Sequence, residues 1–91
     1  MRTYTDLGLY DKEWILKKIT DESNAQLAKW GFQTHSAFEW LTYTTEELGE
    51  LAKAIAEYEY RDGTIRDIVC EAIQVATLAL KIAEMFDKVE P

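Results

Sequence analysis

The chain has 91 residues, of which 47% are hydrophobic and 12% aromatic, and this composition predicts one globular domain spanning residues 1–91. The net charge of −7 argues against a general nucleic-acid or anionic-membrane binder, because no cluster of basic residues offsets the repulsion from phosphate. The single cysteine excludes an internal disulfide, and the sequence shows neither a signal-peptide pattern nor an apolar run of about 20 residues, so we expect a cytoplasmic protein.

The first predicted helix begins after an irregular arm. Residues 1–10 show no periodicity, so we expect them to form that arm. Asp11 is a candidate N-cap, and Gly31 is placed to end the helix because a residue without Cβ adopts the left-handed conformation at little cost. The apolar side chains between them have spacings compatible with one helical face: Leu16, Ile19, Leu27 and Trp30.

The second predicted helix begins at a capping box formed by Ser36 and Glu39 and extends to about Arg61. Its periodicity predicts a core stripe at Phe38, Leu41, Thr45, Leu48, Ala52 and Ile55. A neighbouring row contains Trp40, Thr44, Glu47, Leu51 and Tyr58.

The third predicted helix spans about Ile65 to Phe86, after a break at Asp62-Gly63 and an N-cap at Thr64. It is apolar around most of its circumference, which predicts burial against more than one neighbour and a core position for Cys70. Its many alanines would let another helix approach closely. The predicted fold class is therefore all-α, with long antiparallel helices forming a bundle that homo-oligomerisation completes, as a homodimer or homotetramer.

Acidic side chains recur on the second and third helices. Glu47 and Glu50 are three residues apart and therefore neighbours on a helix, and a second set follows at Asp67, Glu71 and Gln74. If the two helices pack antiparallel, oxygen-bearing side chains meet across the interface and suit Mg²⁺, a hard cation that takes oxygen ligands. The alternative is that these residues form the solvated faces of two amphipathic helices.

The order of these residues resembles that in the MazG-like all-α nucleoside triphosphate pyrophosphohydrolases, in particular the short single-domain phage and bacterial members. The likeness covers roughly residues 11–86. It is carried by Lys29-Trp30-Gly31-x-Gln33-x-His35, by Trp40-Leu41, by Glu46-Glu47-x-x-Glu50, by Glu71 and by Gln74-Val75-Ala76.

The resemblance implies Mg²⁺-dependent hydrolysis of nucleoside or deoxynucleoside triphosphates to a monophosphate and pyrophosphate. It implies that Glu47, Glu50 and Glu71 bind the metal, and that Glu46 assists as a ligand or by positioning water. One of the glutamates, with Glu46 and Glu47 as the candidates, would act as the catalytic base.

One position departs from the family pattern, because Gln74 stands where the second motif usually ends in Asp. An amide oxygen can bind a metal but brings no charge and cannot act as a base. Asp67, one turn before Glu71, could restore that charge, although as the third residue after Thr64 it also fits a helix cap.

Four further residues are candidates for substrate binding. Lys53 and Lys81 could reach a triphosphate, or pair with acidic neighbours on their own helices. Trp30 could stack on a base or pack in the core, and His35 could touch the nucleotide or serve as a surface residue. The rivals to an enzyme are a catalytically weak or inactive nucleotide-binding or interaction module, and a purely structural oligomer.

Overall fold

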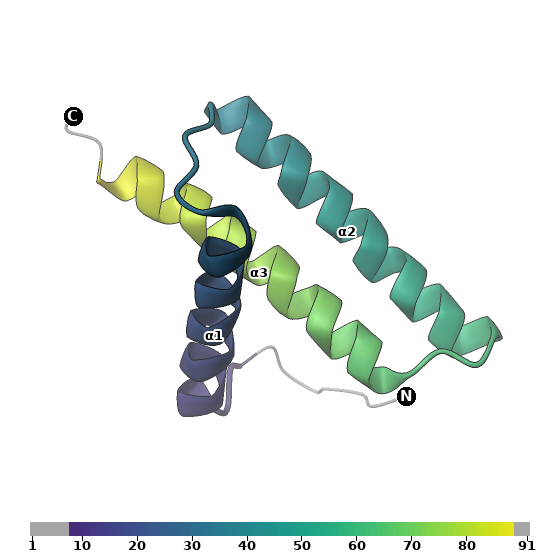
Figure 1. Ribbon diagram of the computed structural model, residues 1–91. Helices are drawn as coiled ribbons and strands as arrows, with labels where there is room; N and C mark the ends of the chain where they lie inside the picture. The colour runs from purple at the N-terminus through teal and green to yellow at the C-terminus, as the bar shows by residue number, and fades with distance from the viewer. Residues whose placement is uncertain (1–7, 89–91) are drawn as a thin grey trace.

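The computed structural model describes residues 8–88, which form three α-helices: α1 (Lys12–Trp30), α2 (Ala37–Tyr60) and α3 (Ile65–Asp87). Figure 1 shows α2 and α3 as an antiparallel pair and α1 packed against α3. Residues 8–88 contain no strand, so the prediction of an all-α chain is confirmed. Of the predicted arm, residues 8–10 lack regular secondary structure, and residues 1–7 lie outside the described part of the chain.

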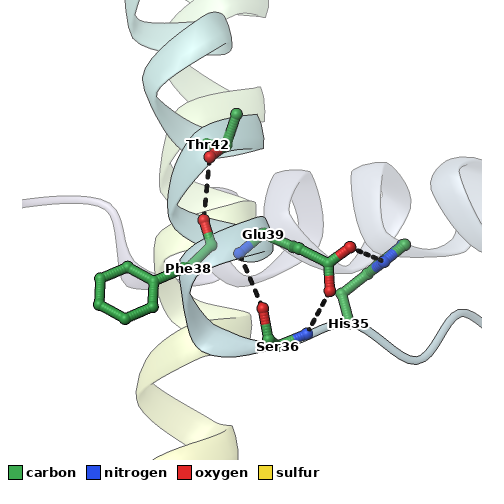
Figure 2. Close-up of polar contacts among 5 residues, drawn as sticks. All are labelled: His35, Ser36, Phe38, Glu39 and Thr42. Carbon is green, nitrogen blue, oxygen red and sulfur yellow. Dashed lines mark hydrogen bonds and ion pairs between the residues drawn. The ribbon is translucent and has the colours of Figure 1, made fainter.

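The predicted caps define the ends of the first two helices. The Asp11 side chain accepts a hydrogen bond from the Trp14 N–H at 3.0 Å, and Gly31 has a φ of 71° at the end of α1. At the start of α2, the Glu39 N–H donates to Ser36 Oγ at 3.2 Å and the Ser36 N–H donates to Glu39 Oε1 at 2.9 Å (Figure 2). This reciprocal capping satisfies two backbone donors that a helix terminus otherwise leaves free.

A tight turn joins α2 to α3. The Gly63 N–H donates to the Glu57 carbonyl at 3.1 Å, and Thr64 caps α3 by accepting from the Asp67 N–H at 3.1 Å. A Cβ on Gly63 would lie 2.7 Å from the Glu57 carbonyl carbon and from the Tyr58 nitrogen, which is closer than real contacts allow. A glycine is therefore required for the chain to reverse so closely and align α3 with α2.

The row of α2 that packs toward α3 differs from the predicted one. In the described chain, the predicted stripe is exposed at all six positions: Phe38, Leu41, Thr45, Leu48, Ala52 and Ile55. The neighbouring row is buried or half-buried instead: Trp40, Thr44, Glu47, Leu51, Ala54 and Tyr58. The prediction of the α2 core face was therefore wrong for the single chain, because two adjacent rows of one helix carry similar periodicity and only the partner helix selects between them.

Few apolar side chains are fully buried among residues 8–88. The buried hydrophobic residues are Ala54 and Leu78, and the buried polar ones are Gln26 and Thr77. Cys70 is exposed, so its predicted core position was wrong; it lies on the side of α3 near Lys18 and Asp21 of α1, which leave it accessible. None of the described helices has the length and apolar character that crossing a membrane would require.

Candidate functional site

Two carboxyl groups meet where α2 packs on α3. Glu47 comes from the half-buried row of α2, and Glu71 comes from the second turn of α3. Burial raises the pKa of Glu47 above its ordinary value. The negative charge of the Glu71 carboxyl and a hydrogen-bonding interaction between the two side chains raise this pKa further. Two ionised carboxylates have only acceptors, so a hydrogen bond between them needs a shared proton. Glu71 Oε2 is buried and has no hydrogen-bond partner.

Two more acidic residues act on Glu47 from outside this pair. The charges of Glu50, one turn further along α2, and of Glu22, on α1, also raise the pKa of Glu47. Glu22 was not among the residues predicted from the sequence. Its position in a different helix, 25 residues before Glu47, gives no local spacing that could have indicated it.

The arrangement supplies oxygen donors for a divalent cation without forming a complete metal cage. Within residues 8–88, no group of three or more histidine, cysteine, aspartate or glutamate side chains converges closely enough to hold a metal alone. Mg²⁺ in nucleotide sites is nevertheless bound by one or two carboxylates together with water and substrate phosphates. The buried, unpaired oxygen of Glu71 beside Glu47 fits that kind of partial site.

A cavity of about 740 Å³ lies between α1, α2 and the C-terminal half of α3, and Glu47 lines it whereas Glu71 does not. This volume lies in the usual range of small-molecule sites, about 300–1,000 Å³. Its acidic and amide side chains are Glu22, Gln26, Gln33, Glu46, Glu47, Gln74 and Glu84. Its basic side chains are Lys81 and Lys88, so the cavity can meet both a cation and an anion.

Lys81 is held in the cavity wall by a chain of hydrogen bonds. Its Nζ donates to Gln26 Oε1 at 2.6 Å, and Gln26 Nε2 donates to Glu22 Oε2 at 2.8 Å. Gln26 is 8% exposed, which fixes the orientation of this amide between the two charged groups. Burial lowers the pKa of Lys81, and the charge of Glu22 opposes that shift. Lys81 is thus a partly desolvated cation whose charge an incoming anion would stabilise.

Aromatic residues contribute to the wall of the cavity. Trp30, Phe32, Trp40 and Tyr43 all line it, and Trp30 and Phe32 are 54% and 95% exposed. His35 does not line the cavity but packs edge-on against Trp40 and Tyr43, with ring centroids 4.9 and 5.1 Å away. Its Nδ1 lies 3.7 Å from Glu39 Oε2 (Figure 2). His35 therefore holds two of the cavity's aromatic residues in place.

The remaining predicted residues are distributed between the cavity and the surface. Glu46 and Gln74 line the cavity, whereas Glu50 is exposed beside Glu47. Asp67 is exposed and occupies the first turn of α3, where its backbone N–H makes the Thr64 cap. Lys53 is exposed on α2 and does not line the cavity. Gln26, like Glu22, was missed, because a glutamine in an amphipathic helix carries no signal of its own.

Comparisons of the chain with family models, with curated proteins and with solved structures find no match.

Proposed function

We propose that this protein is a Mg²⁺-dependent nucleoside triphosphate pyrophosphohydrolase, which releases a nucleoside monophosphate and pyrophosphate. The observation that carries the proposal is the interaction of Glu47, which lines a cavity of nucleotide size, with Glu71, whose Oε2 is buried and has no hydrogen-bond partner. Interaction between like charges across a helix pair is unfavourable unless a proton or a cation lies between them. The residues that carry the sequence resemblance to MazG-like enzymes include both members of this pair.

The proposed roles follow from position. Glu47 and Glu71 would hold the metal, with Glu50 adding negative charge from the exposed side. When bound, Mg²⁺ would neutralise charge on the phosphates and lower the pKa of a coordinated water. Glu46, in the cavity wall next to Glu47, is placed to orient that water or accept its proton.

Other residues of the cavity wall would bind the rest of the nucleotide. Lys81, oriented by Gln26, supplies a partly desolvated positive charge for the phosphates. Trp30 and Phe32 offer exposed ring faces in the cavity wall, and such faces bind bases by stacking without strong sequence preference. The same cavity thus combines acidic, basic and aromatic groups suited to the three parts of a metal–nucleotide complex.

The test is release of pyrophosphate from a panel of nucleoside and deoxynucleoside triphosphates with Mg²⁺ or Mn²⁺. We expect pyrophosphate and monophosphate in equal amounts from the wild type, and at least a 100-fold loss in Glu47→Gln and Glu71→Gln. Glu59→Gln is the matched control, since Glu59 is exposed near the end of α2 and does not line the cavity. No pyrophosphate from any nucleotide with either metal would refute the proposed activity.

A second candidate is a nucleotide-binding module without turnover. It is favoured by Gln74, which contributes no charge to the cavity wall, and by the lack of three converging metal ligands among residues 8–88. This candidate predicts that Mg²⁺ with a triphosphate raises the melting temperature while no pyrophosphate appears. Comparison of the wild type with Gln74→Asp distinguishes the two, because an added carboxylate should increase turnover only where the chemistry already occurs.

A further inference from the structure

The charged side chains that line the cavity differ in exposure. Three are exposed, so solvent and salt screen their charges: Glu46, Glu84 and Lys88. Three are half-buried: Glu22, Glu47 and Lys81. Charges in a partly desolvated site act on a ligand more strongly than screened charges do. The half-buried group therefore decides which charge the cavity accepts, and it contains two carboxyl groups and one ammonium group.

Helix α1 contributes Glu22 to this half-buried group. Glu22 is four residues before Gln26 and eight before Trp30, so the three side chains lie on one face of the helix. All three line the cavity. Because α1 packs against α3 (Figure 1), this face of α1 is directed toward Lys81. The row from Glu22 to Trp30 thus follows the cavity wall on the α1 side.

Glu22 lies within reach of both the carboxyl pair and the cation. Its Oε2 accepts a hydrogen bond from Gln26 Nε2 at 2.8 Å, and Gln26 Oε1 accepts one from Lys81 Nζ at 2.6 Å. The charge of Glu22 raises the pKa of Glu47 and opposes the lowering of the Lys81 pKa by burial. Glu22 therefore borders the space that a ligand would occupy between Glu47 and Lys81.

A neutral amide, rather than a direct ion pair, joins Glu22 to Lys81. Gln26 is 8% exposed and bridges the two charged groups without adding a charge of its own. The neighbouring residue of α1 behaves differently, since Asp21 pairs directly with Lys17 at 2.9 Å. The bridge through Gln26 leaves the charge of Glu22 available to act on a ligand in the cavity.

This charge acts differently on a metal-free triphosphate and on its Mg²⁺ complex. A metal-free triphosphate brings several negative charges, and repulsion by the Glu22 carboxylate opposes its binding. In the Mg²⁺ complex, the attraction of Glu22 for the cation offsets its repulsion of the phosphates. An uncharged side chain of the same shape at position 22 should therefore favour the metal-free ligand selectively.

We infer that Glu22 is a specificity-determining residue, which makes the cavity reject triphosphates that arrive without a divalent cation. The inference rests on the proposed function for the identity of the ligand. It goes further, because neither the sequence resemblance nor the pair of Glu47 and Glu71 assigns a role to Glu22. The role also differs from theirs, since Glu22 acts on the phosphates through its charge and is not a ligand of the metal.

Calorimetric titration of the full chain with α,β-methylene analogues of ATP, GTP, CTP and UTP, in excess EDTA or excess Mg²⁺, tests this role. In Glu22→Gln, we expect the affinity for the metal-free analogue to rise about tenfold, while the affinity for its Mg²⁺ complex stays within about threefold. The amide oxygen of this variant can still accept from Gln26 Nε2, so the substitution removes the charge and retains the bridge. Asp21→Asn is the matched control. Asp21 is exposed and outside the cavity, so the same change in charge should leave both affinities within about twofold.

The ratio of the two affinities is the decisive quantity, because a merely structural defect lowers both together. A Glu22→Gln variant that rejects the metal-free analogue as strongly as the wild type would overturn the inference, whether or not the protein hydrolyses nucleotides. A wild type that binds the metal-free analogue as tightly as the Mg²⁺ complex, or binds neither, would also overturn it. Selection that weakens in Glu22→Gln, without pyrophosphate release from natural triphosphates, would support the role of Glu22 and refute only the proposed turnover.

Discussion

The carboxyl group of Glu47 reaches across the α2–α3 pair to that of Glu71, and Glu71 Oε2 is buried there without a hydrogen-bond donor. A core built only for stability would pair such an oxygen or replace it with an apolar side chain. By contrast, the half-buried Thr44 and the buried Thr77 on the same two helices both donate their hydroxyls to backbone carbonyls at 2.8 Å. Stability alone therefore does not explain the carboxyl pair, and we infer that this pair is the functional part of the helix interface.

Removing one carboxylate should separate function from stability. We expect Glu47→Gln to reduce pyrophosphate release at least 100-fold, because the metal loses a ligand that the proposed activation of water requires. Without metal, the same variant should have a higher melting temperature than the wild type at pH 7, since the amide can donate to Glu71 Oε2. Calorimetry with and without Mg²⁺ measures the second effect. A variant less stable than the wild type in both conditions would contradict it.

The raised pKa of Glu47 predicts a pH dependence of stability. Between the ordinary value of 4.5 and the raised folded value, the folded chain holds a proton that the unfolded chain has lost. The free energy of unfolding of the metal-free protein should therefore fall as the pH rises through this window. Urea unfolding at intervals from pH 4 to 8 measures it, and the difference between the wild type and Glu47→Gln isolates this residue. An equal pH dependence in both proteins would show that Glu47 titrates normally.

The two candidate lysines should differ in their effect on nucleotide binding. Lys81→Met removes a partly buried cation from the cavity wall, so we expect KM for a triphosphate to rise about tenfold, equivalent to about 1.4 kcal/mol. Lys53→Met should leave KM within twofold, because Lys53 is exposed outside the cavity. Steady-state kinetics at fixed Mg²⁺ provide the comparison. A larger effect at Lys53 would place the phosphates on the other side of Glu47.

The capping box of α2 should contribute measurably to stability. Ser36→Ala removes the acceptor for the Glu39 N–H (Figure 2), and we expect a loss of about 1 kcal/mol in the free energy of unfolding. Thr34→Ala is the control, since Thr34 is an exposed residue of the same connector. Its effect should stay within about 0.5 kcal/mol. Chemical unfolding followed by circular dichroism measures both variants.

The turn between α2 and α3 should not accept a side chain. In Gly63→Ala the new Cβ would meet backbone atoms of Glu57 and Tyr58 at 2.7 Å, so the turn must open. We expect a loss of about 1–3 kcal/mol, comparable with overpacking in a core. Asp62→Ala, at the exposed neighbouring position, should be tolerated. Equal stability of the two variants would show that the turn relaxes without cost.

The sequence by itself determined the helices and their ends. Asp11, Gly31, the Ser36–Glu39 box and Thr64 act through residues at most four positions away, so their roles can be predicted without knowledge of the fold. The separation of Glu47 from Glu50 is a local property of the same kind. These short-range interactions were sufficient to predict three helices and to single out the acidic positions.

Only the tertiary structure decided which face of each helix is inside. Two rows of α2 have nearly the same apolar periodicity, and the packing of α3 buries the row that contains Glu47 while the row of Leu48 remains exposed. The same packing brings Gln26 to Lys81 across 55 positions of the sequence. The periodicity of a helix specifies that a face exists but not which neighbour covers it, because that choice depends on contacts between residues far apart in the chain.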